Sequence, residues 1–233
     1  MDFHSHCLPG IDDGAKTVQT SHNMLKRAFE QNVDTVVATP HYKLTNELPS
    51  DFAKRRDSAL EKVAAILEKG KYPRIIPGCE IMLFQHLEEK DLSPLIIREF
   101  NAMLFEFPET GFRPWIINEI ENITFKYKIT PIIAHFERYD KIPSHHLEAL
   151  TSIDGVVFQF NNTALKSLSA IKKMNRLLDM GVPVILSSDA HNDGSRCYNF
   201  DIPNNIFEKR SIFSLPARKL IERMKNTPSP LFK

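Results

Sequence analysis

Two histidines stand two residues apart at the start of the chain, His4 and His6, and Asp189 and His191 repeat that spacing much later. If both runs are strand ends, side chains two residues apart face the same side, so each pair would point into one site. Other histidines and carboxylates follow short apolar runs between the two pairs. Together they make nine candidate nitrogen and oxygen ligands for metal ions: His4, His6, Asp13, His41, Glu80, Glu106, His135, Asp189 and His191.

The chemistry of this set is that of a multi-metal hydrolase. Neutral imidazoles combined with carboxylates suit Mn²⁺, Fe²⁺ or Zn²⁺, whereas Mg²⁺ and Ca²⁺ sites are dominated by oxygen. Nine ligands are too many for one ion, so we expect two or three, with a carboxylate such as Glu80 bridging two of them. Ions held ~3.5–4 Å apart can clamp a phosphoryl group and generate hydroxide from water. The pattern therefore indicates phosphate ester hydrolysis.

Short β-rich runs alternate with longer helical patterns along the chain. Several of the short runs are solid apolar stretches, which are typical of parallel strands covered on both faces. We expect strands over residues 2–6, 35–39, 74–81, 102–107, 131–135, 155–160 and 182–187, and helices over 18–30, 51–69, 113–127, 145–150 and 164–180.

These alternating units predict an α/β fold, a distorted (β/α)₇ barrel in a single domain over residues 1–233. An open, doubly wound sheet is the alternative. The barrel is favoured because the candidate ligands fall at the carboxyl ends of the expected strands, where barrel enzymes gather their catalytic groups. Residues 214–224 read as a closing amphipathic helix, and the Pro-rich tail after it, within residues 215–233, is expected to be frayed.

Bulk properties exclude several other classes of protein. The formal net charge of +1 gives no reason to expect nucleic acid or an anionic membrane as a partner. We find no basic-then-apolar leader and no apolar run near the ~20 residues of a spanning helix, so we expect a soluble, cytoplasmic protein without membrane insertion. Three cysteines fit a reducing compartment. None is followed by arginine at the spacing that cysteine-dependent phosphatases use.

Several ordered runs carry a resemblance to a known family. They are His4–His6, Leu8–Gly14, Ala38–Tyr42, Gly78–Glu80, Glu106–Pro108, Ala134–Tyr139 and Ser188–His191 with Arg196. In this order they resemble the polymerase-and-histidinol-phosphatase (PHP) superfamily. The runs at Ile11–Gly14 and Ala38–His41 are similar to its bacterial manganese-dependent protein-tyrosine phosphatases of capsule and exopolysaccharide operons.

The resemblance implies how the site is organised. It groups His4, His6, Glu80 and Asp189 around one ion, Glu80, Glu106 and His135 around a second, and Asp13, His41 and His191 around a third. It places the two substrate-binding arginines at Arg138 and Arg196, which would hold phosphate oxygens while a metal-activated hydroxide attacks. It implies hydrolysis of phosphotyrosine, with Mn²⁺ as the preferred ion, on the tail of a bacterial tyrosine kinase that controls capsule or exopolysaccharide synthesis.

Two other functions stay open from the sequence. One is another phosphoesterase of the same superfamily, such as a histidinol-phosphate phosphatase; the other is a metal-stabilised regulatory protein without turnover. Phe136 stands where the family has proline, so we expect a shifted Arg138 loop and altered activity, with the metal site retained. The remaining histidines match no motif and are expected to be solvated: His22, His86, His145 and His146. The oligomeric state is not predicted.

Overall fold

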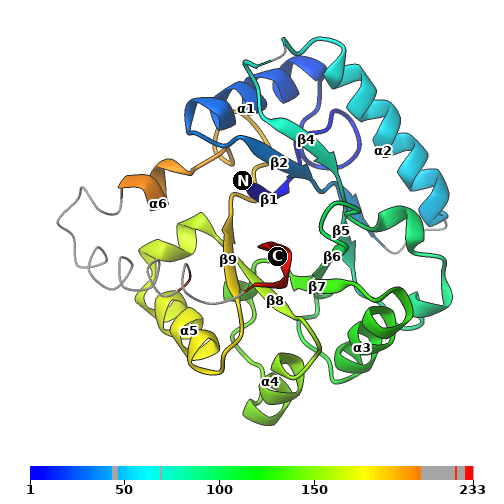
Figure 1. Cartoon of the computed structure of the whole chain (residues 1–233), viewed down its shortest axis with the longest axis vertical. Coiled ribbons are helices and arrows are strands. Elements are labelled where there is room, and N and C mark those ends of the chain that lie inside the picture. The colour runs from blue at the N-terminus through cyan, green and yellow to red at the C-terminus, as the bar shows by residue number, and fades with distance from the viewer. Residues whose placement is uncertain (44–46, 69, 206–223, 225–228, 233) are drawn as a thin grey trace.

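Parallel strands surround the centre of the molecule and helices lie outside them in this computed structural model (Figure 1). The structure describes residues 1–43, 47–68, 70–205, 224 and 229–232. Two sheets are present, with strand orders β1-β2-β4 and β3-β5-β6-β7-β8-β9. The strands are β1 (Asp2–Ser5), β2 (Thr35–Ala38), β3 (His41–Tyr42), β4 (Arg74–Pro77), β5 (Glu80–Met82), β6 (Ala102–Glu106), β7 (Thr130–Ile133), β8 (Val157–Asn161) and β9 (Val184–Ser187).

The fold is the distorted (β/α)₇ barrel that the sequence predicts. Because β2 continues into β3 and β4 into β5, the nine strands of the described ranges occupy seven positions. Backbone hydrogen bonds join the two sheets. At one side Gly78 donates to Ala38 over 2.8 Å and Glu80 to Pro40 over 3.1 Å, and at the other Asp189 donates to His4 over 2.9 Å and His6 to Ala190 over 2.8 Å. The strand pairing is irregular between the sheets, and these backbone hydrogen bonds carry the connection there.

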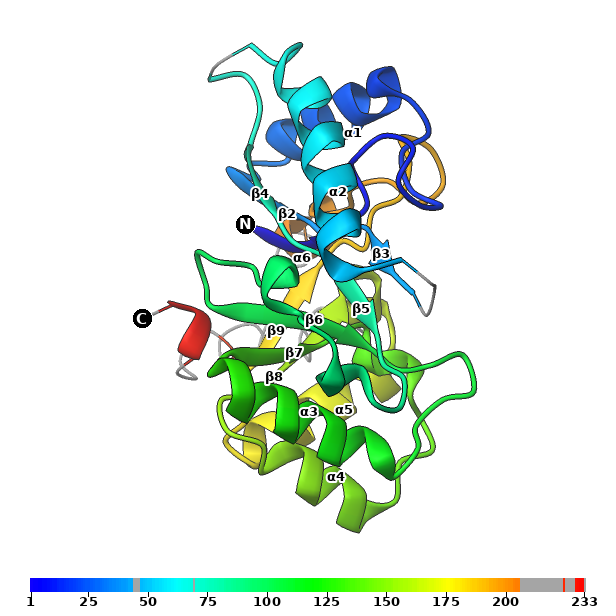
Figure 2. The same cartoon turned by 90° about the vertical axis from the view of Figure 1, so that its right-hand side faces the viewer.

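Helices follow most of the strands. They are α1 (Val18–Glu30), α2 (Pro49–Ala64), α3 (Trp115–Tyr127), α4 (Ser144–Thr151), α5 (Leu168–Asp179) and α6 (Asp201–Asn205). Short 3₁₀ turns are η1 (Leu87–Glu89), η2 (Ser93–Leu95), η3 (Phe136–Arg138), η4 (Asn162–Lys166) and η5 (Pro230–Phe232). In Figure 2, α1 and α2 lie at one end of the molecule and α3, α4 and α5 at the other. Of the helices within the described residues, none combines the length and apolar character needed to cross a bilayer.

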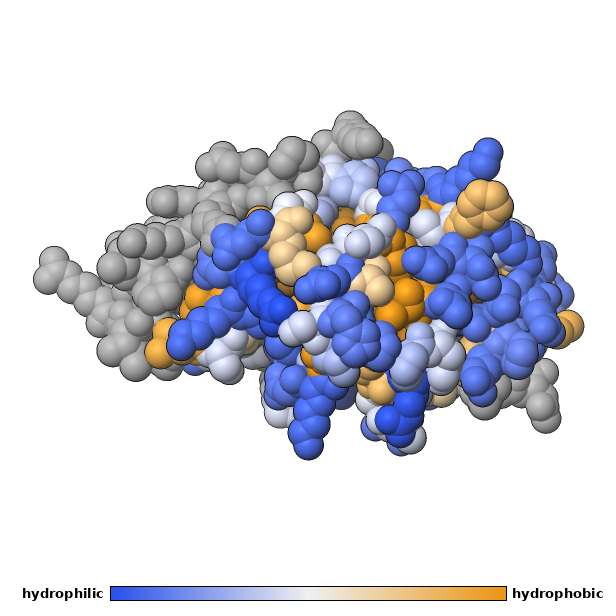
Figure 3. Space-filling view, turned by 90° about the horizontal axis from the view of Figure 1, so that it is seen from below, coloured by the Kyte–Doolittle hydropathy of each residue, from blue (hydrophilic) through white to orange (hydrophobic). Residues whose placement is uncertain are grey.

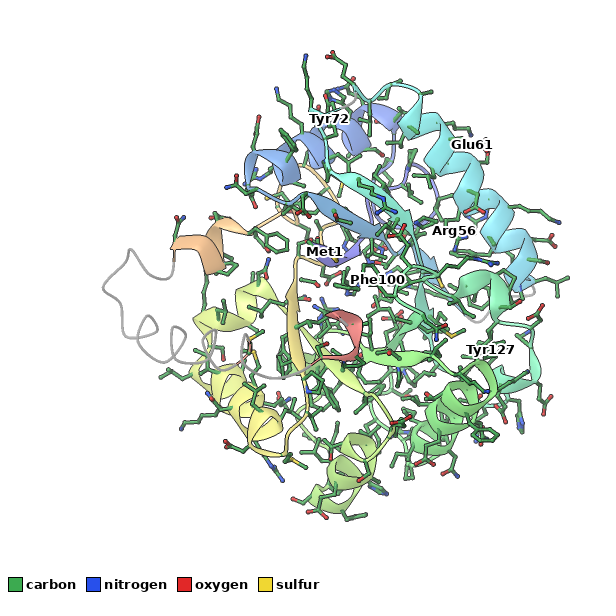
Figure 4. The ribbon with its side chains drawn as sticks, in the orientation of Figure 1. Met1, Arg56, Glu61, Tyr72, Phe100 and Tyr127 are labelled. Carbon is green, nitrogen blue, oxygen red and sulfur yellow. The ribbon has the colours of Figure 1, made fainter. Side chains whose placement is uncertain are left out.

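The structure corrects the expected strand over residues 74–81. It divides into β4 and β5 at Gly78, where a Cβ atom would lie 2.9 Å from the Val37 side chain. The freed carbonyl of Gly78 accepts a hydrogen bond from Arg56 of α2 over 3.3 Å. Figure 4 shows Arg56 on the helix beside this break. The division lets β5 leave the first sheet and pair with β3 and β6.

Two other expectations at element ends are also wrong. The helix expected over 164–180 begins at Leu168, because Ser167 caps it by accepting from the Ala170 amide and a 3₁₀ turn precedes it. The helix expected over 51–69 ends at Ala64. The closing helix expected over 214–224 lies outside the described residues apart from Met224.

The interior of the barrel is apolar toward the amino ends of the strands. A cluster of buried side chains there includes Phe3, Leu104, Ile132 and Val157, and Leu231 of η5 belongs to it with 5% of its surface exposed. The described part of the tail is therefore packed, where the sequence predicts fraying. In Figures 1 and 2, η5 lies on the same side of the barrel as the start of β1.

A second, larger cluster packs the helices onto the outside of the sheet. Its buried members include Phe105 of β6, Ile120 of α3 and Leu177 of α5. The outer surface of the helices is polar: in Figure 3, which views the molecule from the α4 side, hydrophilic side chains cover most of the face and hydrophobic groups show between them. The helices thus bury one face each, as amphipathic helices of a barrel do.

Candidate metal centre

Glu80, the first residue of β5, lies at the centre of a buried cluster of histidines. One carboxylate oxygen, Oε1, accepts from Nε2 of His135 over 2.8 Å. The other, Oε2, lies 3.1 Å from Nε2 of His4, 3.2 Å from Nε2 of His6 and 3.1 Å from Nδ1 of His41. Four candidate ligands, all histidines, thus surround the carboxylate of a fifth, Glu80.

Strand register brings these side chains together from distant parts of the sequence. His41 and Glu80 are direct partners across β3 and β5, and Glu106 at the end of β6 pairs with Met82. His135 lies two residues after the end of β7. His41 and Glu80 begin the short strands that continue β2 and β4, so all four lie toward the carboxyl end of the barrel, which is where a barrel gathers residues from several loops. The remaining candidates come from β1 and from the loops after β1 and β9: His4, His6, Asp13, Asp189 and His191.

One step of the sequence argument is wrong in detail. Asp189 and His191 lie beyond the end of β9 and are not alternate residues of a strand. Asp189 has a left-handed backbone with φ of 52°, which only a few non-glycine residues adopt. This turn still brings Oδ1 of Asp189 to 3.5 Å from Nε2 of His4 and 3.6 Å from Nε2 of His6. The side chain of Asp189 therefore enters the site because the backbone turns there, and not because Asp189 and His191 alternate along a strand.

Several atoms of the cluster lack ordinary hydrogen-bond partners. Oε2 of Glu80 and Nδ1 of His41 are buried and make no hydrogen bond. Nε2 of His4 and Nε2 of His6 face each other at 3.2 Å, so one nitrogen presents its lone pair to the other. Converging, unsatisfied lone pairs of this kind are costly in a protein interior unless a cation binds them. The donor set therefore fits divalent metal ions.

Electrostatics within the cluster supports the same conclusion. Burial lowers the pKa of both His4 and His6, but neighbouring carboxylates outweigh it and raise the pKa of His4 to about 9 and that of His6 to about 10. Burial likewise raises the pKa of Glu80, but the charge of His4 and the hydrogen bond from His135 hold it well below its ordinary value. The carboxylates thus favour positive charge at this position, which bound cations would supply.

The geometry also shows which ring nitrogen some histidines present. Nδ1 of His6 donates to Oδ2 of Asp12 over 2.7 Å, and Nδ1 of His191 donates to the Asp189 carbonyl over 2.9 Å. In both rings Nε2 therefore remains for a metal. Burial raises the pKa of Asp12, but the His6 hydrogen bond and charge, together with bonds from backbone amides of His41 and Gly14, bring it to about 2.

Among the described residues, three groups of candidate ligand atoms lie close enough to hold an ion each. Within each group the atoms lie no more than 4.8 Å apart. The groups are His6, Asp13, His41 and His191; His4, His6 and Glu80; and His41, Glu80 and Glu106. They share His6, His41 and Glu80, as a multi-nuclear centre requires. They differ from the grouping that the resemblance implies, in which His135 and Asp189 each serve an ion, so the distribution of ligands among ions stays a prediction.

The two candidate substrate arginines lie over the open side of the cluster. Arg138 forms an ion pair with Oδ2 of Asp189, and Arg196 lies 3.5 Å from the same oxygen and 3.6 Å from Oδ2 of Asp13. Their side chains are 47% and 45% exposed, whereas Asp189 is buried. Two half-exposed guanidinium groups thus lie at the rim of the site, close to the buried carboxylate of Asp189 and, for Arg196, to the exposed carboxylate of Asp13.

Phe136 anchors the loop that carries Arg138. Its ring is buried against Phe158 at a centroid distance of 4.5 Å, and the preceding residue, His135, adopts a left-handed backbone with φ of 32°. Side-chain packing therefore holds this loop, and Arg138 reaches Asp189. Glu137 points away from the cluster and accepts from the Asn161 amide.

The other histidines and the cysteines lie outside the site. His86 and His145 are exposed, as expected, but His22 is half-buried with Nε2 2.6 Å from the Tyr72 hydroxyl, and the half-buried His146 ring lies against Phe112. Those two histidines are therefore not simply solvated. All three cysteines are free, and Cys7 and Cys79 are fully buried in the hydrophobic core.

Two residues at the end of β8 contact the cluster and were missed from the sequence. Gln159 lies 3.0 Å from Nδ1 of His4, and Asn161 donates to Asp189 over 3.0 Å. Their two-residue spacing repeats that of His4 and His6, so the same alternation could have revealed them. The spacing alone did not single out Gln159 and Asn161, because the candidate ligands were imidazoles and carboxylates and these two side chains are amides.

A parallel (β/α)₇ barrel with clustered imidazoles and carboxylates at one end defines a metallohydrolase-like architecture. The chain matches the family described as "Capsular polysaccharide synthesis, CpsB/CapC" over residues 1–219, and it belongs to this family.

Curated relatives agree with this membership. The tyrosine-protein phosphatase YwqE of Bacillus subtilis is 27% identical over 225 residues, covering 93% of this chain and 87% of the relative. The tyrosine-protein phosphatase CpsB of Streptococcus pneumoniae is 28% identical over 216 residues, covering 84% of each.

Solved structures confirm the fold. One from work on YwqE of B. subtilis and CpsB of S. pneumoniae, described as metal-dependent tyrosine phosphatases, matches with a TM-score of 0.70 at 22% identity, covering 98% of this chain and 95% of the other. A histidinol phosphate phosphatase of Lactococcus lactis matches with a TM-score of 0.55 at 12% identity, covering 98% and 94%.

Proposed function

We propose that this protein is a metal-dependent protein-tyrosine phosphatase. The observation that carries the proposal is the cluster around Glu80, in which side chains of the candidate ligands converge close to two arginines. The names of its relatives YwqE and CpsB support the choice of phosphotyrosine. The proposal treats residues 1–233 as one domain that acts in the cytoplasm.

The nine residues would hold two or three divalent ions, with Mn²⁺ as our first choice and Fe²⁺ or Zn²⁺ as alternatives. Bound ions would supply Lewis acidity and a hydroxide nucleophile at neutral pH. The protein contributes the orientation of its ligands, through outer hydrogen bonds such as that from His6 to Asp12. Cys7 and Cys79 take no part, because they are buried in the hydrophobic core.

Arg138 and Arg196 would bind the phosphate. A guanidinium is a planar fork that can hold two phosphate oxygens at once, and two of them can follow the charge that spreads over the equatorial oxygens during transfer. Both now contact Asp189 with about half of their surface exposed, so substrate can reach them from solvent. Asp189 holds the two cations in place between turnovers.

The exposed rim favours a protein substrate. Asp13, at the edge of the cluster, has 56% of its side chain exposed, and the arginines are similarly open. A phosphotyrosine on an extended peptide could reach such a site without a conformational change. We propose the tyrosine-phosphorylated tail of a bacterial kinase of capsule or exopolysaccharide synthesis as the partner, and no nucleic acid.

Histidinol phosphate is the second candidate substrate, because a histidinol phosphate phosphatase shares the fold. The decisive experiment removes metal with a chelator, adds back Mn²⁺, Fe²⁺ or Zn²⁺ singly, and compares hydrolysis of a phosphotyrosine peptide with that of histidinol phosphate. We expect Mn²⁺-dependent release of phosphate from the peptide, abolished in His6→Ala and Glu80→Ala and kept in the exposed control His145→Ala.

Preference for histidinol phosphate would replace the substrate assignment and keep the metal centre. Absence of hydrolysis of either substrate by protein that binds metal would overturn the enzyme assignment. The remaining hypothesis would be a regulatory protein that the metal stabilises.

A further inference from the structure

Gln159 and Asn161 form a buried chain of amides between two candidate metal ligands. Both belong to β8, and 0% and 8% of their surfaces are exposed. Gln159 contacts His4 from the first strand of the chain, and Asn161 contacts Asp189 beyond the last. The two amides also contact each other, so they join the two ligands through a continuous set of hydrogen bonds.

The backbone determines the direction of the first bond in this chain. The His135 amide lies 2.7 Å from the Gln159 side chain, and a backbone N–H can only donate. The Gln159 atom that faces it must therefore be the carbonyl oxygen, Oε1. The same oxygen lies 3.0 Å from Nδ1 of His4, and since it has no hydrogen to give, Nδ1 of His4 must be the donor.

The donor and acceptor of each remaining hydrogen bond in this series follow from the first. With Oε1 assigned, Nε2 of Gln159 donates to Oδ1 of Asn161 over 3.0 Å. This leaves the amide nitrogen of Asn161 to donate to Oδ2 of Asp189 over 3.0 Å, which a carboxylate oxygen can accept. Every donor meets an acceptor, and reversing either amide would oppose two donors or two acceptors.

We propose that Gln159 is a positioning residue that fixes the tautomer of His4, so that Nε2 of His4 is the nitrogen available to metal. Through Asn161 the same residue holds Oδ2 of Asp189, which leaves Oδ1 facing Nε2 of His4 at 3.5 Å. It also fixes the left-handed backbone of His135 by accepting from its amide. One amide thereby orients three candidate ligands contributed by different strands.

This inference rests on the proposed function only through the assignment of His4, His135 and Asp189 as metal ligands. Outer hydrogen bonds of this kind typically contribute about 10–100-fold to metal affinity. Gln159→Met keeps the length of the side chain and removes both the acceptor and the donor. Gln159→Glu keeps an acceptor oxygen for His4 and His135, replaces the donor to Asn161 with an acceptor and adds a negative charge. Gln85→Met makes the same change on an exposed glutamine and serves as the control.

The first measurement is ¹⁵N NMR of the histidine rings in the whole wild-type protein loaded with Zn²⁺, a diamagnetic ion that binds imidazole. We expect His4 to carry its proton on Nδ1 and to bind the ion through Nε2. A protonated Nε2 with metal on Nδ1 would overturn the proposal directly. This measurement needs no variant, so it decides the question even if Gln159→Met does not fold.

The second measurement is Mn²⁺ affinity by competition with a chelator. We expect about 10–100-fold weaker binding in Gln159→Met, substantial recovery in Gln159→Glu and no change in Gln85→Met. Wild-type affinity in a folded Gln159→Met would refute the positioning role. Peptide hydrolysis is not measured, so a protein that binds metal in this way but lacks phosphatase activity would contradict only the proposed function.

Discussion

The two ends of the barrel interior are built from the same faces of the same strands and have opposite character. Along β6, Ala102 and Leu104 lie in the apolar cluster, and Glu106, two residues further on the same face, enters the metal centre. Along β8, Val157 lies in the apolar cluster and Gln159 contacts His4. A step of two residues, about 6.6 Å, thus separates a packed core from a cluster of charges.

The difference shows how stability and chemistry are divided along the barrel. At the amino end, buried side chains such as Leu231 contribute hydrophobic free energy and carry no charge. At the carboxyl end, His4, His6 and Glu80 are just as fully buried, but their desolvation opposes folding and is offset by their interactions with one another and with Asp12, His135 and Asp189. Changes at the two ends should therefore affect different properties.

The largest expected effect is at the carboxyl end, where a substitution should lower kcat/KM and leave the free energy of unfolding nearly unchanged. Arg138→Ala should lower kcat/KM for a phosphotyrosine peptide about 10²–10³-fold, because a positioned cation that stabilises transition-state charge is removed. Mn²⁺ content and the free energy of unfolding should change little, since the side chain is half exposed. Steady-state kinetics with metal analysis tests this, and Arg98→Ala, an exposed arginine beside Ile97 of the apolar cluster, is the control.

The next largest effect is expected at the amino end, where a substitution should lower stability and leave activity unchanged. Leu231→Ala should reduce the free energy of unfolding by about 2 kcal/mol, near the lower limit for a buried leucine, because a short terminal turn can relax into the space. kcat/KM should be unchanged. Urea denaturation measures the loss, and Leu168→Ala, where the leucine is 42% exposed, should cost much less. A loss of activity in folded Leu231→Ala would show that the two ends are coupled.

The smallest effect concerns a buried carboxylate of α3 that belongs to neither end. Burial and a hydrogen bond with Glu88 raise the pKa of Glu119 from 4.5 to about 7. Between these values the folded protein keeps a proton that the unfolded chain releases, so the free energy of unfolding should fall as pH rises from about 4.5 to 7. Glu119→Gln should flatten this slope.

Urea denaturation at pH 5 and pH 7.5 tests this prediction. Glu61→Gln on the exposed face of α2, labelled in Figure 4, should retain the wild-type slope. An unchanged slope in Glu119→Gln would show that Glu119 is ionised in the folded protein across this range.

The fold class could be predicted because apolar runs and helical patterns are local properties of the sequence. The division of β4 from β5 could not, because it depends on the approach of Val37 to Gly78 from another strand. The start of α5 was within reach, since Ser167 is a recognisable capping residue. The buried position of Leu231 depends on a barrel that exists only once all the strands are assembled.

The candidate site was predictable to a similar extent. His4, His41 and Glu80 were identified as candidate ligands by type and spacing, and the structure brings both histidines to the carboxylate of Glu80. The roles of Gln159 and Asn161 were not, because a hydrogen-bonded amide differs from a surface amide only in its neighbours. The turned backbone at Asp189 was equally hidden, since left-handed aspartates have no sequence pattern of their own.

The pairing of the first strand with the residues after the last has a consequence for biosynthesis. The carboxylate of Asp2 accepts from both the amide and the hydroxyl of Ser188, a partner 186 residues later in the chain. Contacts so distant in sequence slow folding, because a long loop must close before they form. While the ribosome is still adding residues before Ser188, His4 and His6 have no complete set of neighbours. An unfinished chain therefore carries no assembled metal centre, and hydrolytic capacity arises only when synthesis has passed the end of β9.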